Sequence, residues 1–261
     1  RQRQMCIRDR ANCAALARRA IEMKYKDISD NYSLARICIY FLALICLVPT
    51  TPTPIANAQG ESAPDCTGSY RISKTLSTNA MWDFCWEHRD QEGIVFHNIF
   101  DTSPQGTRRK VLSQASLAQV HTPFDDDSFR YHYVTDLGLG GMQMLSLQEG
   151  ECLDGTIHSH ASRNILCEQV EGRGYIYKSY LQQRQGEYLS LFSISNLGGQ
   201  SLIVRWRFYD DGSIEPAVGS SGYITHVGAD SNYGWPLGTD NTFGIGYTNN
   251  YYWRFDFDLG E

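Results

Sequence analysis

Apolar and polar residues alternate along several short stretches of the chain, most clearly between residues 201 and 209. Every second residue there is large and apolar, and these residues are Leu202, Val204, Trp206 and Phe208. Such alternation predicts a β-strand with one buried face. The Asp-Asp-Gly sequence at 210–212 suits a tight turn, so residues 213–218 are expected to form the returning strand of an antiparallel hairpin. Another apolar strand is predicted at 188–194.

A similar pattern occurs earlier in the chain, where aromatic residues alternate within the segment 79–100. This segment predicts two strands around a turn at 90–93. The basic run at 108–110 is interpreted as a solvated loop. Because no long apolar stripe of helical period is present, the sequence predicts an all-β fold. Residues 59–261 are numerous enough to bury one core.

The first 58 residues are expected to lie outside this domain. Residues 1–22 resemble translated adapter sequence and are interpreted as a non-native leader. Residues 23–58 combine basic residues, an apolar run at 37–48 and an Ala-Asn-Ala site, which is typical of a secretory signal peptide. A membrane anchor is the alternative, but this run is shorter than the ~20 residues that span a bilayer. We therefore expect a secreted protein, extracellular or periplasmic, with its domain at 59–261.

The net charge of the expected domain indicates which classes of partner it can bind. Residues 59–261 contain 14 Lys and Arg against 25 Asp and Glu, a formal net charge of −11. Nucleic acids and anionic membranes bind cationic surfaces, so neither is an expected partner. A cationic or amine ligand is more compatible with this charge.

The cysteines of the expected domain predict disulfide bonds. Four cysteines lie in the expected domain, namely Cys66, Cys85, Cys152 and Cys167. An even set in an exported chain predicts disulfides, and four cysteines allow three pairings. A zinc site is the alternative, but the domain has no Cys-x-x-Cys pair.

Two other motifs could carry chemistry. His158 and His160 are two positions apart on a predicted strand, a spacing that can chelate copper or zinc, although such histidines commonly face solvent. The glycine-rich run at 138–141 could be mistaken for a phosphate-binding loop. It lacks the Lys-Ser/Thr that follows such loops and no helix is expected after it.

The hairpin sequence WRFYDDGSIEPAVGSSG at 206–222 resembles the catalytic domain of copper amine oxidases, the primary amine oxidases that use topaquinone. Weaker matches in the same order occur at 79–100, 108–127, 131–147 and 251–258. The resemblance implies an all-β β-sandwich of the catalytic-domain (supersandwich) type, incomplete at its C-terminus. A generic β-sandwich adhesion or carbohydrate-binding module is the alternative fold.

The resemblance also assigns the family's functional positions to residues of this chain. The tyrosine that becomes topaquinone falls on Gln200, and a glutamine amide has no ring to oxidise. The catalytic base falls on Tyr133, with Asp136 as a second candidate if the alignment slips. The two histidine ligands of copper that lie within this chain fall on Tyr247 and Asn249, and phenol and amide are poor ligands for Cu(II). We therefore expect neither copper nor topaquinone to be retained.

The resemblance further implies a disulfide between Cys152 and Cys167, which leaves Cys66 for Cys85. Members of the family form homodimers through this domain and through extended hairpin arms. A homodimer is therefore implied here, although no such arm is evident in the sequence.

Two functions follow as hypotheses. The first is a secreted, catalytically inactive homologue that acts as a binding or structural module. The second is an active primary amine oxidase, which deaminates primary amines with release of peroxide and uses residues other than those assigned above. In that case Tyr133 becomes an alternative quinone precursor, or His158 and His160 belong to a different metal centre.

Overall fold

The computed structural model describes residues 63–224, 226–238 and 241–258, which lie in one compact unit at 58–261. The predicted leader and signal segments, 1–22 and 23–58, lie outside the described residues. The unit is built almost entirely from antiparallel strands, which confirms the all-β prediction. No helix in the described part of the chain is long and apolar enough to cross a membrane.

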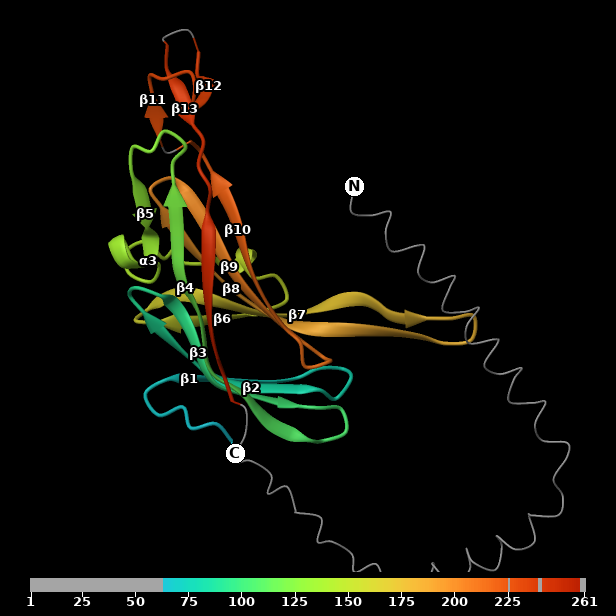
Figure 1. Cartoon of the computed structure of the whole chain (residues 1–261). Coiled ribbons are helices and arrows are strands. Elements are labelled where there is room, and N and C mark those ends of the chain that lie inside the picture. Colours follow the sequence, from blue (N-terminus) through green and yellow to red (C-terminus); the bar gives the residue numbers. More distant parts are fainter. Residues whose placement is uncertain (1–62, 225, 239–240, 259–261) are drawn as a thin grey trace, which may run out of the picture. The chain divides into compact units, whose positions relative to one another are not determined.

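The first sheet has six strands, in which β4 pairs with β3 on one side and β14 on the other (Figure 1). The order is β1-β2-β3-β4-β14, and β5 pairs with the end of β4. The strands are β1 (Tyr70–Thr75), β2 (Met81–Arg89), β3 (Gly93–Thr102), β4 (Arg108–Pro123), β5 (Arg130–His132) and β14 (Asn250–Phe257). Strands β4 and β14 are far apart in sequence, so their pairing brings residues near 120 beside residues near 250.

The second sheet has five strands in the order β10-β9-β8-β7-β6, each paired antiparallel with its neighbour in sequence. They are β6 (Thr156–His160), β7 (Arg163–Lys178), β8 (Gln183–Leu197), β9 (Gln200–Tyr209) and β10 (Ile214–Gly222). Burial alternates residue by residue along β9, as the sequence pattern predicts. The turn at 210–212 joins β9 to β10, and Gly212 adopts a φ of 84° there.

Short elements complete the unit. A third sheet contains β11 (Val227–Gly228), β13 (Phe243–Ile245) and β12 (Gly234–Pro236) in that order. The described part also contains the one-turn helix α3 (Tyr133–Asp136) and the 3-10 turn η1 (Glu149–Glu151). Helix α3 matters because it carries two of the predicted site residues, Tyr133 and Asp136.

Aromatic residues of the two large sheets form the core between them. The rings of Phe84 in β2 and Phe208 in β9 stack with centroids 4.8 Å apart. Phe96 in β3 meets Trp206 edge to face at 5.7 Å. Trp82 Nε1 donates a hydrogen bond of 2.9 Å to the Tyr209 carbonyl oxygen, so even the polar edge of this side chain joins the sheets. The alternating aromatic residues therefore make a β-sandwich.

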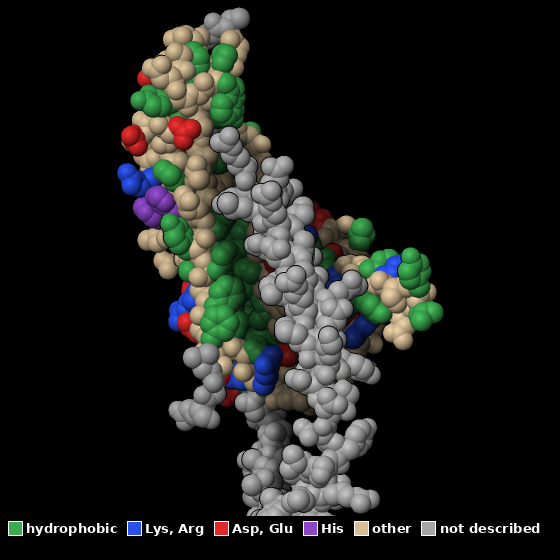
Figure 2. All heavy atoms as spheres, turned by 45° about the vertical axis from the view of Figure 1, so that its right-hand side comes forward, with side chains coloured by type: hydrophobic (Ala, Val, Ile, Leu, Met, Phe, Trp, Pro, Cys, Tyr) green, Lys and Arg blue, Asp and Glu red, His purple; other side chains and the backbone are tan. Residues whose placement is uncertain are grey.

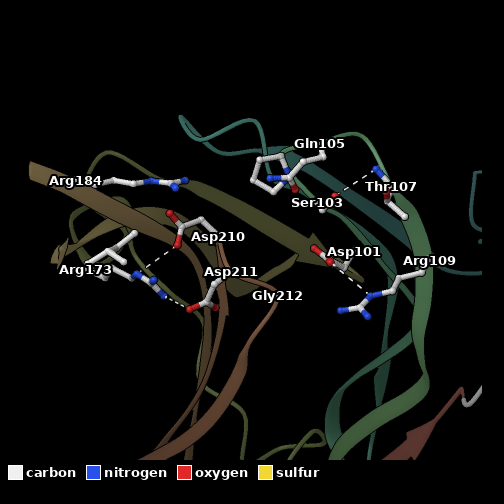
Figure 3. Close-up of a pocket in the computed structure, with 12 residues that line it drawn as sticks. Asp101, Ser103, Gln105, Thr107, Arg109, Arg173, Arg184, Asp210, Asp211 and Gly212 are labelled. Atoms are coloured by element: carbon white, nitrogen blue, oxygen red, sulfur yellow. Dashed lines mark hydrogen bonds and ion pairs between the residues drawn. The ribbon is translucent and has the colours of Figure 1, made fainter. Parts of the chain in front are cut away.

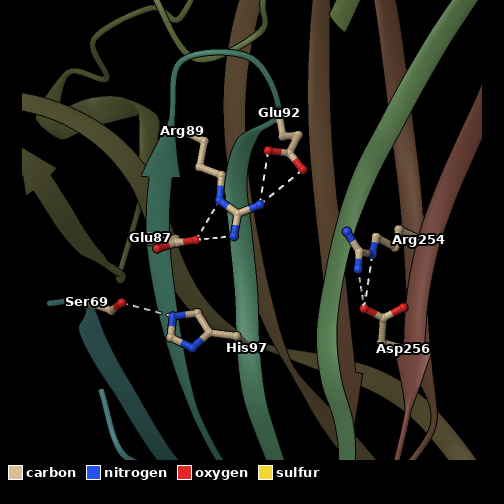
Figure 4. Close-up of polar contacts among 7 residues, drawn as sticks. All are labelled: Ser69, Glu87, Arg89, Glu92, His97, Arg254 and Asp256. Carbon is tan, nitrogen blue, oxygen red and sulfur yellow. Dashed lines mark hydrogen bonds and ion pairs between the residues drawn. The ribbon is translucent and has the colours of Figure 1, made fainter. Parts of the chain in front are cut away.

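The predicted hairpin at 79–100 is confirmed as β2 and β3. Polar side chains surround its turn, where Arg89 Nε donates to Glu87 at 2.6 Å and Arg89 Nη1 lies 3.2 Å from Glu92 (Figure 4). The backbone amides of Gly140 and Gly141 both donate to the Asp90 carbonyl oxygen at 2.9 Å. The glycine-rich loop is thus bonded to this turn, and these amides are not directed at a ligand.

The prediction of a solvated loop at 108–110 is wrong, because these residues begin β4. Arg108 Nη2 lies 3.0 Å from Asp83 Oδ2, and its guanidinium lies over the Phe100 ring at 4.3 Å. Asp83 is buried, and Arg71 Nη2 reaches the same oxygen at 2.7 Å. Two arginines therefore neutralise a buried carboxylate, which the basic run alone did not reveal.

A hairpin arm is present, although none is evident in the sequence. The distal parts of β7 and β8 run out from the sandwich as a two-stranded arm (Figure 1). Its sequence is rich in Gly, Gln and charged residues and shows no clean apolar alternation, so the strand pattern was hidden. Apolar side chains gather around the end of this arm (Figure 2). The exposed ones are Tyr175, Ile176, Tyr177, Tyr180 and Leu181.

Both predicted disulfides are present. Cys152 bonds Cys167 across the start of β7, and Cys66 bonds Cys85 in β2. The first joins the segment before β6 to β7 of the second sheet, and the second joins the segment before β1 to β2 of the first sheet. Both pairings agree with those implied by the resemblance.

Candidate functional site

A buried cluster of amides lies where β9 begins and β14 is about to begin. Gln200 is the first residue of β9 and is 1% exposed. Asn249 Nδ2 lies 3.5 Å from Gln200 Oε1 and is placed to donate to it. Thr122 in β4 donates its hydroxyl hydrogen to Asn249 Oδ1 at 2.6 Å. The cluster therefore joins three strands through neutral side chains.

The glutamine at the centre of this cluster is not fully satisfied. Gln200 Nε2 is buried and has no hydrogen-bond partner among the described residues. A buried amide donor without an acceptor costs stability on the order of 1–3 kcal/mol. An apolar side chain at this buried position would avoid this cost, so Gln200 is not an ordinary core residue.

Two tyrosines lie beside the amide cluster. Tyr247 forms an isolated β-bridge with Phe124, two residues beyond Thr122 in the chain. Tyr133 in α3 is 2% exposed, and its ring stacks on Tyr131 with centroids 5.0 Å apart. Burial, together with the neighbouring Tyr131 and Tyr247, raises the pKa of Tyr133 to about 12. The Tyr133 phenol therefore stays protonated at neutral pH and is a poor base there.

These side chains do not suit the cofactors of copper amine oxidases. Copper sites in proteins favour imidazole and thiolate ligands, whereas this cluster offers two amides, a hydroxyl and phenols. The described residues contain no group of three or more His, Cys, Asp or Glu side chains that could hold a metal ion. Gln200 also has no aromatic ring from which a quinone could form.

The structure separates Asp136 from the buried cluster. Asp136 is exposed on α3, and its Oδ2 accepts a hydrogen bond of 2.7 Å from the backbone N–H of His132. That contact satisfies an amide at the start of the short helix, which is a structural role. Tyr133, at the other end of the same turn, points into the core instead.

His158 and His160 have separate partners rather than a common one. His158 Nε2 lies 2.8 Å from Glu168 Oε2 in the neighbouring strand β7. His160 Nδ1 lies 3.2 Å from the Tyr70 hydroxyl, and its ring stacks on His88 with centroids 4.8 Å apart. A register shift between His158 and Ser159 accompanies this divergence.

Sequence reasoning missed an open pocket near the opposite end of β9. It has a volume of about 450 Å³ and lies around the turns at 103–107 and 210–212. Gln200 and Tyr209 mark the two ends of β9, which are about 30 Å apart at the usual rise of a strand. The pocket contains buried aspartates from different sheets, Asp101 and Asp210, and no single sequence motif joins them.

Comparisons with known proteins identify relatives among copper-dependent oxidases. No family model matches the chain. A primary amine oxidase of Arthrobacter sp. (strain P1) is 23% identical over 232 residues, covering 79% of this chain and 35% of the relative. The copper-containing diamine oxidase 1 of Nicotiana tabacum is 22% identical over 179 residues, covering 60% of this chain and 23% of the relative. The chain thus spans about a third or less of these relatives.

Solved structures show the same fold. The copper-containing benzylamine oxidase of Hansenula polymorpha superimposes with a TM-score of 0.56 and 16% identity, covering 79% of this chain and 37% of that one. The lysyl oxidase of Pichia pastoris gives a TM-score of 0.57 and 17% identity, covering 91% of this chain and 35% of that one. In sequence and in fold, the chain is therefore a copper amine oxidase-like β-sandwich domain.

Proposed function

We propose that this protein is a secreted copper amine oxidase-like module that has lost amine oxidation and acts by binding. One observation carries the proposal. The resemblance assigns Gln200 to the cofactor tyrosine and Asn249 to a copper ligand, and these residues are 3.5 Å apart although 49 positions separate them in the chain. Their proximity supports the alignment, and their chemistry supports the loss of activity.

Each of the other assigned positions supports the same conclusion. The resemblance assigns Tyr133 to the position of the base, and burial holds its phenol in the protonated form. Tyr247, at the other copper position, packs with its ring 5.8 Å from that of Phe124. At the positions that the resemblance assigns to a carboxylate and imidazoles, this chain has aromatic packing and an amide network, which supports the loss of activity.

The disulfides support export. Cys66–Cys85 and Cys152–Cys167 both lie in the folded unit, and disulfides persist mainly in oxidising compartments. The same compartments are the destination that the signal-like segment at 23–58 predicts. Export of the chain can be checked by locating the native protein in culture medium, periplasm and cytoplasm.

A homodimer is part of the proposal. The arm of β7 and β8 presents tyrosine, isoleucine and leucine side chains far from the core of its own sheet. Exposed apolar clusters of this kind are typical of protein interfaces. A second copy of the chain is the partner we expect for this arm.

The decisive experiment for lost activity uses the product of the complete gene, expressed with copper supplied. We expect no peroxide with primary amines, no quinone by redox-cycling staining and less than stoichiometric copper after dialysis. A triple variant, Gln200→Tyr with Tyr247→His and Asn249→His, provides a matched comparison for metal uptake. We expect this variant to bind more Cu(II) than the natural protein.

The outcomes separate the two functions. Peroxide release or a quinone in the natural protein would show that it is an active amine oxidase with its catalytic residues elsewhere. In that case Tyr133→Phe and the pair His158→Ala with His160→Ala would identify which alternative centre is used. Stoichiometric copper at the natural Tyr247 and Asn249 would also contradict the proposal.

A further inference from the structure

The open pocket near the turns at 103–107 and 210–212 has the properties of a ligand site. Its volume of about 450 Å³ falls within the usual range for small-molecule sites, about 300–1,000 Å³. Asp101 and Arg109 lie on one side of the pocket, and Asp210 and Arg184 lie on the other (Figure 3). The walls come from both large sheets, so folding brings these charges together.

Asp101 is the group that most needs a partner. It is 4% exposed, and its Oδ1 has no hydrogen-bond partner among the described residues. Its Oδ2 lies 3.8 Å from Arg109 Nε, which is longer than a hydrogen bond. Burial raises the pKa of Asp101, and Arg109 only partly offsets this shift. A charged donor that reaches this carboxylate from the pocket would relieve the cost of burying it.

The neighbouring aspartates are already paired with an arginine. Arg173 Nε lies 3.3 Å from Asp210 Oδ1, and Arg173 Nη1 donates to Asp211 Oδ2 at 2.7 Å. Asp210 Oδ2 also accepts a weak hydrogen bond from the Glu187 amide at 3.4 Å. Arg173 therefore pairs with both of these aspartates, whereas the ion pair of Asp101 with Arg109 is longer, at 3.8 Å.

A positive charge without a partner lies on the side of the pocket opposite Asp101. Arg184 in β8 lines the pocket, and its guanidinium has no ion pair or hydrogen bond with any described residue. A guanidinium is a rigid fork of donors that matches a carboxylate well. The pocket thus combines a buried carboxylate that is only loosely paired, Asp101, with a guanidinium that has no side-chain partner among the described residues, Arg184.

We propose that this pocket binds a small zwitterion, with a primary ammonium at Asp101 and a carboxylate at Arg184. This inference rests on the proposed binding role and names its ligand class. A simple cation fits less well, because Arg109 and Arg184 would repel it. A metal ion fits less well, because no three metal-ligating side chains converge in the described part of the chain.

The experiment titrates the complete protein with a series of ω-amino acids, from glycine through β-alanine and 4-aminobutyrate to 6-aminohexanoate, by calorimetry. Alkylamines and alkyl carboxylates of the same lengths are the controls. We expect one chain length to bind best and to exceed both single-charge analogues in affinity by about tenfold or more, since each analogue lacks one of the two charged hydrogen bonds.

Two variants assign the ends of the ligand. Asp101→Asn should weaken binding of the zwitterion and of the alkylamine but leave binding of the alkyl carboxylate unchanged. Arg184→Gln should weaken binding of the zwitterion and of the alkyl carboxylate but leave binding of the alkylamine unchanged. Because Arg184 is exposed, it can be replaced with little risk to folding. Asp90→Asn and Arg254→Gln are matched controls at exposed positions outside the pocket, and neither should alter binding.

Three results would overturn the inference. The first is absence of binding at millimolar concentrations for the whole series. The second is equal affinity for the zwitterion and either single-charge analogue, and the third is an equal effect of the control variants. Because the titration contains no copper and follows no oxidation, its result is separate from the test for lost amine oxidase activity.

Discussion

Burial changes the acid–base behaviour of single side chains at both candidate sites. Asp101 and Tyr133 each have a pKa raised by desolvation, so each favours its neutral form more in the folded protein than in water. For Tyr133 the neutral phenol is the form present at neutral pH, so its burial costs little there. For Asp101 the charged form is the usual one at neutral pH, and a buried carboxylate is stabilised by a cationic partner.

The raised pKa of Tyr133 predicts a loss of stability at alkaline pH. Unfolded phenols ionise near pH 10.0, whereas folded Tyr133 does so at about 12. As pH rises between these values the unfolded state gains charge and the folded state does not, so the free energy of unfolding falls. Two pKa units correspond to on the order of 2–3 kcal/mol.

Urea unfolding of natural protein and Tyr133→Phe across this interval measures the effect. We expect the free energy of unfolding to fall less in the variant than in the natural protein between pH 10 and 12. Below pH 9 it should change with pH equally in both proteins. Tyr223→Phe is the control, since Tyr223 is exposed and lies outside the arm. If the free energy of unfolding falls equally with pH in the natural protein and in Tyr133→Phe, the raised pKa of Tyr133 is contradicted.

At the scale of elements, the strands are held by local cross-links as well as by the core. Cys152 and Cys167 close a loop with a sequence separation of 15, which fastens the segment before β6 to β7. A cross-link of this size stabilises a fold by about 3 kcal/mol, mainly by restricting the unfolded chain. Phe192 and Leu147 pack against these cysteines as a small separate cluster.

Removing this disulfide should therefore weaken the fold without changing its architecture. We expect the double variant Cys152→Ser with Cys167→Ser to lose about 3 kcal/mol in denaturant unfolding, with an unchanged far-ultraviolet spectrum. The double variant Cys66→Ser with Cys85→Ser is the companion measurement. A loss below 1 kcal/mol for the first variant would show that packing alone holds the segment.

At the scale of the whole molecule, the arm is the surface that most needs a partner. Tyr180 is 107% exposed and Leu181 is 94% exposed, so neither is covered by its own chain among the described residues. We expect the natural protein to sediment as a dimer and the double variant Tyr180→Ser with Leu181→Ser to dissociate more readily. Hot-spot losses of about 2 kcal/mol each would raise the dissociation constant several hundredfold or more.

A control separates arm contacts from general surface hydrophobicity. Met142 is 94% exposed on a loop outside the arm, so Met142→Ser should leave dimerisation unchanged. The thermal stability of each monomer should also be unchanged, because these side chains make little contact within the chain. A natural protein that sediments as a monomer at all concentrations would overturn the dimer.

The sequence by itself determined the all-β class, the hairpin around 210–212, the hairpin at 79–100 and the disulfide set. These features depend on residue periodicity, on turn chemistry and, for the cysteine pairing, on the resemblance. Local pattern suffices there because a strand shows its buried face in every second residue. Gln200 and Asn249 were assigned as single positions, and nothing local indicated that their amides meet.

Only the tertiary structure decided the arm, the pairing of β4 with β14 and the pocket around Asp101. The arm strands face solvent, so no apolar alternation marks them. Pairing between strands more than a hundred residues apart depends on how the whole sheet closes. Asp101 reads as an ordinary polar residue in the sequence, and it becomes a site because two sheets bury it beside charges from distant turns. Burial and long-range charge are properties of the folded chain, since they depend on which residues the fold places around a group.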